Sequence, residues 1–192
     1  YTDHGHDHLG ADRGADLHPF VGYNFRISEL HAAVGLAQIR KLHQFLEIQR
    51  RNYSKLKSVL AQIPEISFRS IPDPAGDSCT FLSWFLPTEA VTRAVVAELK
   101  ARNILGGNFY WYDNNWHYIR KWDHLKQQKT LYPLNDAQLA ALQQLSSQNF
   151  AASDAVMSRC ISSVISLLWS EEDIANKAEA IAAAVKKVLE EQ

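Results

Sequence analysis

The feature that most limits how this chain can fold is a long helical pattern between Ser28 and Ile63. Ser28 is a good N-cap, and Glu29 places a negative charge where it meets the positive end of the helix dipole. The pattern ends at Ile63 because Pro64 disfavours the α region for the residue before it. Apolar residues recur at close to helical spacing: Leu30, Val34, Ala37, Leu42, Phe45, Leu46, Tyr53, Leu56 and Leu60. One unbroken helix would span about 50 Å, which is long for a globular protein, so we expect a bend near Lys41 to His43.

The segment before this helix is a short polar and aromatic turn, Gly22 to Ile27. Asn24 supplies two amide donors and Arg26 a fork of donors, and both groups suit phosphate or carboxylate oxygens. Two plainer interpretations stay open. Asn24 could simply form the turn, and Arg26 could pair with a carboxylate near the helix start.

The seventeen residues from Gly22 to Gln38, GYNFRISELHAAVGLAQ, resemble the signature stretch of the DegT/StrS family of sugar aminotransferases, which have fold type I. The resemblance implies pyridoxal 5'-phosphate as the cofactor and a homodimer that shares its active sites. It implies that Asn24 binds the cofactor phosphate of the partner subunit. Arg26 is implied to contact either that site or an anionic group of the substrate.

The resemblance also implies an upstream segment. The family's Schiff-base lysine lies before the signature and ahead of a glycine-rich turn, and nothing in this sequence matches it. We therefore expect an upstream segment that binds the cofactor, and no catalytic residue in this chain. Three regions are expected: residues 1–27 as the end of the large cofactor domain, 28–63 as a long inter-domain helix, and 64–192 as a small C-terminal α/β domain.

Residues 1–19 are polar, broken by glycines, and rich in histidine. His4, His6 and His8 share one face of an extended segment, and neutral imidazole is a common metal ligand. Alternation alone fixes no tetrahedral geometry, so we predict no metal site here. The alternatives are a solvated loop and substrate contact by His6 and His8, because the segment before the signature helps to line the active site in family members.

The remaining residues predict alternating strands and helices, which gives a small mixed or antiparallel sheet covered by helices, an α/β (α+β) fold. The strands expected are 66–71, an inner strand 79–86, and 160–168. The helices expected are 89–102 with Val91, Val95 and Leu99 inward, 136–148 after Asn135, and a last helix to 191 after a capping box at Ser170 to Asp173. Residues 123–133 are expected to be a loop, and 146–158 a connector or frayed helix. The final strand and helix also resemble the family's ending.

Residues 106–118 have the most unusual composition in the chain, with six aromatic side chains and one histidine from Phe109 to Tyr118. Flat ring faces beside short polar groups suit a sugar, which offers C–H faces to stack and hydroxyls to bond. The candidate substrate contacts are Tyr112, Asn115, Trp116 and His117. The alternative is a loop whose aromatic side chains, Trp111 above all, fill the domain core.

Composition excludes several classes of protein. The net charge is −1, and only Arg120, Lys121 and Lys126 lie near the aromatic residues, so we predict no nucleic-acid partner. No apolar run approaches the roughly 18 residues of a spanning helix, which predicts no membrane partner and a cytoplasmic protein. Cys79 and Cys160 lie in apolar patterns and are expected to be inert.

Taken with the resemblance, the chain is expected to serve an enzyme that moves an amino group from glutamate to a keto or aldehyde sugar in lipopolysaccharide or amino-sugar biosynthesis. Within the family, the histidines at 4–8 followed by residues 111–117 resemble members that aminate an octulosonate oxidised to an aldehyde at carbon eight. An amino-sugar nucleotide stays open. A carbohydrate-binding module without catalysis and a His-rich metal-binding protein are the alternatives.

Overall fold

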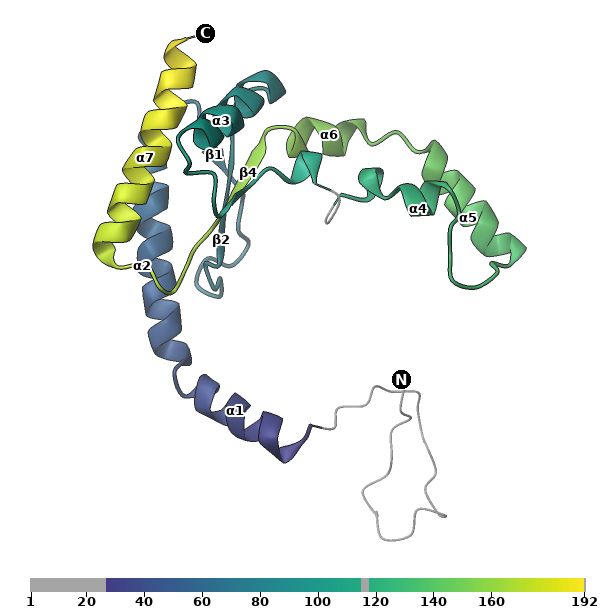
Figure 1. Ribbon diagram of the computed structural model, residues 1–192, viewed down its shortest axis with the longest axis horizontal. Helices are drawn as coiled ribbons and strands as arrows, with labels where there is room; N and C mark the ends of the chain where they lie inside the picture. Colours follow the sequence, from purple (N-terminus) through teal and green to yellow (C-terminus); the bar gives the residue numbers. More distant parts are fainter. Residues whose placement is uncertain (1–26, 115–117, 192) are drawn as a thin grey trace. The chain divides into compact units, whose positions relative to one another are not determined.

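A computed structural model of the chain describes residues 27–114 and 118–191 (Figure 1). The chain divides into two compact units, Tyr1–His43 and Gln44–Gln192. The helices and strands in chain order are α1 (Glu29–Ile39), α2 (Leu42–Leu60), β1 (Ser67–Phe68), β2 (Phe81–Phe85), α3 (Glu89–Ala101), β3 (Asn108–Phe109), η2 (Trp111–Asp113), η3 (Ile119–Lys121), α4 (Asp123–Lys126), α5 (Asp136–Ser147), α6 (Ala151–Met157), β4 (Cys160–Val164) and α7 (Glu171–Glu190).

The long helical pattern forms two helices rather than one. Helix α1 begins after Ser28, whose side chain accepts a hydrogen bond from the backbone N–H of His31, and α1 ends at Ile39. The backbone N–H of Lys41 then bonds to the carbonyl of Gln38 at 2.9 Å, which tightens the last turn before α2 begins. The break therefore lies beside the predicted bend.

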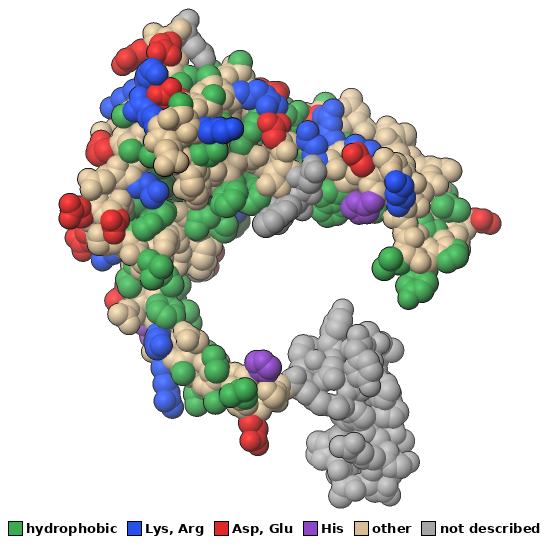
Figure 2. Space-filling model, in the orientation of Figure 1, with side chains coloured by type: hydrophobic (Ala, Val, Ile, Leu, Met, Phe, Trp, Pro, Cys, Tyr) green, Lys and Arg blue, Asp and Glu red, His purple; other side chains and the backbone are tan. Residues whose placement is uncertain are grey.

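Helix α1 has no buried residue, although much of it is apolar. Leu30 is 74% exposed and Ile39 is 62% exposed, and Figure 2 shows hydrophobic side chains along this helix. These exposures are those of the described residues, and apolar side chains so exposed are available to contact further protein.

The second unit is built on a four-stranded antiparallel sheet with the strand order β1-β2-β4-β3. The central pair is β2 and β4, in which Trp84 lies opposite Ile161 and Phe85 lies opposite Cys160. Strand β3 adds at the other side of β4, where Asn108 lies opposite Ser163. Segments far apart in the sequence therefore meet at β4, and the aromatic residues that follow β3 start from this edge of the sheet.

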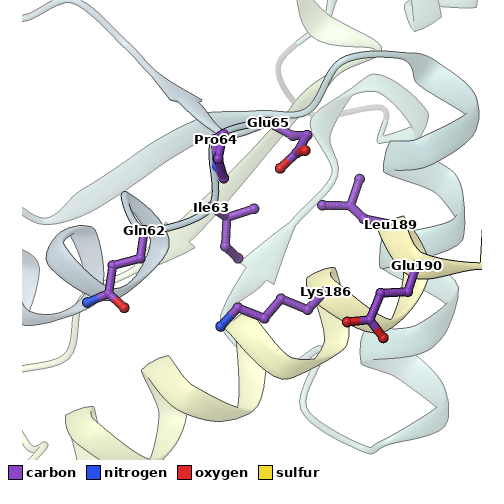
Figure 3. A pocket seen from close by; sticks show the side chains of 7 residues that line it. All are labelled: Gln62, Ile63, Pro64, Glu65, Lys186, Leu189 and Glu190. Carbon is purple, nitrogen blue, oxygen red and sulfur yellow. The ribbon is translucent and has the colours of Figure 1, made fainter.

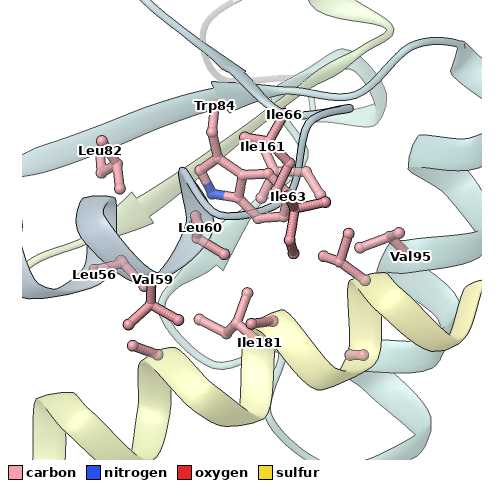
Figure 4. Close-up of a cluster of buried hydrophobic side chains, with 14 of the residues drawn as sticks. Leu56, Val59, Leu60, Ile63, Ile66, Leu82, Trp84, Val95, Ile161 and Ile181 are labelled. Carbon is pink, nitrogen blue, oxygen red and sulfur yellow. The ribbon is translucent and has the colours of Figure 1, made fainter. Parts of the chain in front are cut away.

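The hydrophobic core of this unit lies between the sheet and helices α2, α3 and α7 (Figure 4). Each element contributes side chains that are at most 1% exposed: Leu56 and Leu60 from α2, Leu82 and Trp84 from β2, Val95 and Leu99 from α3, Ile161 from β4, and Ile181 and Val185 from α7. Burying each such side chain stabilises the fold by about 1.5–3 kcal/mol. This core holds α3, which carries Arg93, and the sheet, whose strand β3 leads into η2 and Tyr112.

The helix predictions for the second unit are confirmed. Helix α3 starts where Thr88 caps the backbone N–H of Val91 and buries the predicted inward face. Helix α5 starts at the Asn135 cap, and α7 follows a capping box formed by Ser170 and Asp173.

The three predicted strands are shorter than expected. Strand β2 begins at Phe81 rather than at residue 79, because Cys79 has a φ of 59° and leaves the extended conformation. Strand β4 ends at Val164 because side chains of α2 bind the carbonyl groups that follow it. Gln49 donates to the carbonyl of Ile165 at 2.5 Å, and Asn52 donates to the carbonyl of Ser166 at 3.1 Å.

Short helices lie in the segment predicted as a loop and in the segment predicted as a connector or frayed helix, and the second agrees with the helical alternative. Helix α4 lies within the predicted loop 123–133, so that prediction is wrong at its start. Helix α6 lies within residues 146–158, where a side-chain oxygen of Asn149 accepts a hydrogen bond from the backbone N–H of Ala151 at 2.9 Å. This local bond favours a helix start near Ala151, which the polar composition of the segment does not indicate.

Candidate functional site

The structure describes one of the predicted site residues, Tyr112. The other predicted contacts lie outside the described residues: His6, His8, Asn24 and Arg26 near the start of the chain, and Asn115, Trp116 and His117 after η2. His4 of the metal alternative also lies outside them. The roles given to these residues stay predictions, and the geometry of the candidate site rests on the neighbours of Tyr112.

Tyr112 lies in the middle of a row of aromatic rings. Its ring is 6.0 Å from that of Tyr110 and 6.0 Å from that of Tyr118. Tyr118 in turn meets Phe150 edge-on at 6.5 Å. The row therefore runs from the end of β3 to the start of α6, and it brings together residues that are distant in sequence.

The two outer tyrosines are held in place by their hydroxyl groups. The Tyr110 hydroxyl donates to the carbonyl of Ser158 at 2.8 Å, and the Tyr118 hydroxyl donates to the carboxylate of Asp154. Burial raises the pKa of Tyr110 to about 12 and also raises the pKa of Tyr118, so both groups stay protonated donors at neutral pH. Tyr112 contacts its neighbours through its ring.

Arg93 of α3 fastens the η2 turn to the rest of the unit. Its guanidinium binds both oxygens of Asp113, with Nη1–Oδ2 at 2.6 Å and Nη2–Oδ1 at 3.0 Å, and its Nε binds Glu89 at 2.8 Å. The same group lies 5.4 Å from the ring centre of Tyr110 and 5.8 Å from that of Tyr112. Hydrogen bonding to Asp113, and then to Glu89, raises the pKa of Arg93 above its ordinary value.

A second cation lies against Tyr112. The ammonium of Lys121 is 5.7 Å from the centre of the Tyr112 ring. Two cations within about 6 Å of one ring form cation–π contacts that favour a fixed ring position. Sequence analysis missed Arg93 and Lys121 as partners of Tyr112. Arg93 lies within the predicted helix 89–102, far from Tyr112 in sequence, and no local pattern indicates that the two side chains meet.

The alternative in which the aromatic side chains fill the core is wrong for Trp111, although Tyr118 of the same cluster is buried, at 6% exposure. Trp111 is half-buried and stacks on Phe109, with ring centres 4.7 Å apart and planes 6° from parallel. The indole in the core is Trp84, whose Nε1 donates to the hydroxyl of Ser163 at 3.0 Å. Residues 109–114 therefore form a half-exposed surface of rings, which is the arrangement that stacking against a ligand requires.

Cys79 and Cys160 are both buried, and burial raises the pKa of each thiol, which disfavours the reactive thiolate at neutral pH. Within residues 27–114 and 118–191, no group of three or more His, Cys, Asp and Glu side chains could hold a metal ion. No helix in the same residues has the length and apolar character needed to cross a bilayer.

A separate cavity of about 280 Å³ lies where the end of α2 meets the end of α7 (Figure 3). It is lined by Gln62, Ile63, Pro64, Glu65, Lys186, Leu189 and Glu190. No aromatic ring lines it, so it lacks the stacking surface expected of a sugar site.

Three curated proteins are similar to part of this chain, and two of them are named as 3-dehydratases of nucleotide-linked keto-deoxysugars. The chain is 31% identical over 100 residues to a GDP-4-keto-6-deoxy-D-mannose 3-dehydratase from Yersinia pseudotuberculosis, covering 46% of this chain and 24% of that protein. It is 37% identical over 65 residues to the lipopolysaccharide biosynthesis protein RfbH of Salmonella typhimurium (34% and 14% covered). It is 33% identical over 100 residues to a dTDP-4-dehydro-2,6-dideoxy-D-glucose 3-dehydratase of Saccharopolyspora spinosa (46% and 21% covered). The aligned part is thus at most about a quarter of these relatives' length.

The fold matches a solved structure. A crystal structure of 3-amino-5-hydroxybenzoic acid synthase superposes with a TM-score of 0.56 at 22% sequence identity, covering 92% of this chain and 43% of that one. At this identity the match shows the fold alone, and the predicted fold class is confirmed. The sequence model of the DegT/DnrJ/EryC1/StrS aminotransferase family matches residues 1–182, which is nearly the whole chain. The chain therefore belongs to the DegT/DnrJ/EryC1/StrS aminotransferase family.

Proposed function

We propose that this chain is part of a pyridoxal 5'-phosphate-dependent enzyme that transfers an amino group from glutamate to a keto or aldehyde sugar. The observation that carries the proposal is the family match over residues 1–182, which contains the signature stretch Gly22 to Gln38. The cofactor, when bound, serves as an electron sink, and the protein supplies binding, orientation and electrostatics.

In this proposal Asn24 binds the cofactor phosphate of the partner subunit, and Arg26 binds that site or an anionic group of the substrate. Both residues come just before α1, whose N-terminal end carries partial positive charge and favours an anion. The apolar side chains of α1 are exposed, which supports the proposal that further protein covers them, either the upstream segment or the partner subunit. The proposed assembly is therefore a homodimer with shared active sites.

The sugar would be bound by Tyr112, Asn115, Trp116 and His117, with His6 and His8 from the start of the chain. The half-exposed ring surface around Tyr112 supports this assignment, because it offers faces on which a sugar can stack. We propose an octulosonate aldehyde as the acceptor, with the product used in lipopolysaccharide biosynthesis in the cytoplasm. The regions 1–27, 28–63 and 64–192 would then be the end of the cofactor domain, the linking helices and the small domain.

The test uses the longer protein with its upstream segment restored. It would be incubated with glutamate and either the octulosonate aldehyde or a nucleotide-linked ketosugar, and the amino sugar and 2-oxoglutarate would be measured. The proposal expects both products in equal amounts with one of the two acceptors. Turnover of neither acceptor by protein that has bound the cofactor would refute it.

A second candidate function is the removal of a C3 hydroxyl from a nucleotide-linked keto-deoxysugar. The names of the Yersinia and Saccharopolyspora relatives favour it, since both are 3-dehydratases. The same incubation separates the two functions. Amino transfer gives a product that carries nitrogen, whereas dehydration gives a nitrogen-free product that has lost the elements of water.

A further inference from the structure

A small polar pocket lies beyond the end of the aromatic row, and its lining contains none of the predicted site residues. It has a volume of about 190 Å³ and lies between η3, α4, the end of α5 and the start of α6. Its lining residues are Arg120, Lys126, Leu145, Ser146, Gln148, Asn149 and Phe150. Phe150 belongs to the aromatic row through its edge-on contact with Tyr118, so the pocket adjoins the row that holds Tyr112.

The pocket lies in a basic part of the described chain. Residues 119–130 contain four cationic side chains, Arg120, Lys121, Lys126 and Lys129, against one carboxylate, Asp123, although the whole chain has a net charge of −1. Figure 2 shows Lys and Arg side chains at the surface over this part of the molecule. Local positive charge around a hollow attracts and retains an anion.

Among the described residues, each cation of the pocket pairs with one carboxylate. Arg120 pairs with Asp154 through Nη1, and a guanidinium has five N–H donors in all. Lys126 lies 3.3 Å from Asp123, and these side chains are 43% and 72% exposed, so the pair is weak and easily exchanged for another anion. The side chain of Arg120 is 45% exposed, which leaves it accessible from the pocket.

The other polar groups suit hydroxyl groups. The Oδ1 atom of Asn149 accepts the backbone N–H of Ala151, which orients the amide, and the amide nitrogen carries two N–H donors that suit hydroxyl or carboxylate oxygens. The hydroxyl of Ser146 donates to the carbonyl of Leu142 at 2.8 Å, so its oxygen remains an acceptor. Phe150 adds an apolar ring. Cations, amides, a hydroxyl and one ring together match a ligand that is both anionic and hydroxylated.

The size of the pocket limits that ligand. Pockets for drug-sized molecules are about 300–1,000 Å³, which is larger than the 190 Å³ found here. The pocket therefore fits one oxyanion with the carbon atoms and hydroxyls next to it, and not a whole nucleotide-linked sugar.

We propose that the pocket between Arg120 and Lys126 binds the oxyanion of a hydroxylated small molecule, either the carboxylate of a sugar acid or the phosphate of a sugar phosphate. The pocket and its chemistry are independent of the proposed aminotransferase function. Only the identification of this ligand with the sugar substrate rests on that function. In that case the pocket would hold the acidic end of the substrate while the aromatic row contacts its ring.

The test is a titration of the 192-residue chain, without cofactor, followed by NMR of the Gln148 and Asn149 side-chain amides. The probes are 3-deoxy-octulosonate, inorganic phosphate, a nucleoside-diphosphate sugar, and glucose as the uncharged control. We expect saturable shifts with a Kd of about 1 mM for at least one anion, and binding of glucose at least about tenfold weaker. A tighter Kd for the octulosonate identifies the carboxylate as the ligand group, and a tighter Kd for the phosphates identifies phosphate.

Matched variants separate the pocket from the general charge of the segment. Lys126→Gln is expected to weaken anion binding about threefold to tenfold, and Arg120→Gln more than Arg120→Lys, because lysine keeps the charge but loses the fork of donors. Lys129→Gln removes an exposed lysine that does not line the pocket, and it should weaken anion binding less than Lys126→Gln does. Thermal unfolding checks that each variant is folded.

Three results would overturn the proposal: no saturable shift with any anion, equal binding of glucose, or the same loss in Lys129→Gln as in Lys126→Gln. Amino transfer plays no part in this measurement, so a failure here leaves the proposed function untouched. Anion binding in a protein that transfers no amino group would likewise leave the pocket established.

Discussion

The contact between Arg93 and Asp113 gives a prediction whose size can be worked from the structure. The guanidinium binds both carboxylate oxygens, at 2.6 Å and 3.0 Å, and the two side chains are 44% and 47% exposed. Exposed ion pairs contribute about 0.2–1 kcal/mol, and bidentate geometry places this pair at the upper end. We therefore expect a coupling free energy of about 1 kcal/mol between Arg93 and Asp113.

Replacing Arg93 by alanine should cost more than this coupling alone, because the guanidinium also lies over the rings of Tyr110 and Tyr112. Each cation–π contact at an exposed site adds about 0.5 kcal/mol, so the total loss is about 2 kcal/mol. For a chain of this length such a loss lowers the Tm by about 4–8 °C. Arg93→Lys keeps the charge but loses the bidentate geometry, so its Tm should lie between that of the unmodified chain and that of Arg93→Ala.

The assay is a double-mutant cycle with Arg93→Ala, Asp113→Ala and the double variant, each followed by urea unfolding at low and high salt. The coupling should shrink as salt screens the partly exposed charges. A coupling below about 0.3 kcal/mol at low salt would refute the reasoning, since additivity at that level is typical of residues that do not interact. In that case Arg93 would not fasten the turn that carries Tyr112.

Three further predictions concern the fold. Leu99→Ala, at a fully buried position, should lower the free energy of unfolding by about 2–5 kcal/mol, whereas Leu131→Ala, at a side chain 97% exposed, should change it by less than about 0.5 kcal/mol in urea unfolding. Hydrogen bonds from the side chain and then the backbone of Ser170 lower the pKa of Asp173. Its stabilising contribution is therefore present above the unfolded pKa of about 3.9 and is lost as the pH falls through the lower folded value, and Ser170→Ala should flatten this part of the stability–pH curve. A thiol reagent should modify Cys160 slowly in the folded chain and rapidly in urea, because burial both covers the thiol and raises its pKa.

Helices were predicted from sequence more accurately than strands because their signals are local. The caps at Thr88 and Ser170 and the spacing of Val91, Val95 and Leu99 are contained within a few residues, and the structure has them as predicted. Strand ends depend on distant partners. Strand β4 stops where Gln49 and Asn52 of α2 take the carbonyl groups that a longer strand would use, and no local pattern announces a bond across more than 100 residues.

In the candidate site, too, local features could be predicted from sequence and long-range contacts could not. Composition identified residues 106–118 as unusual and selected Tyr112, but it could not supply the residues that hold this tyrosine. Arg93 comes from a helix before the cluster, and Phe150 joins the aromatic row from well after it. The signature stretch identified the family, which the match over residues 1–182 confirms, because seventeen consecutive positions carry far more information than any single side chain.

The most direct test of the proposed function asks whether Asn24 serves the active site of the partner subunit. In the longer protein, Asn24→Ala would be combined in one dimer with a partner whose upstream catalytic lysine is replaced by alanine, each variant being inactive or nearly so by itself. If Asn24 acts across the interface, one of the two sites in the mixed dimer has both an intact lysine and an intact Asn24. Each mixed dimer should then have about half of the amino-transfer activity of an unmodified dimer. If the mixed dimer forms but stays as inactive as its parents, Asn24 does not hold the cofactor of its partner, and the proposed shared site is wrong.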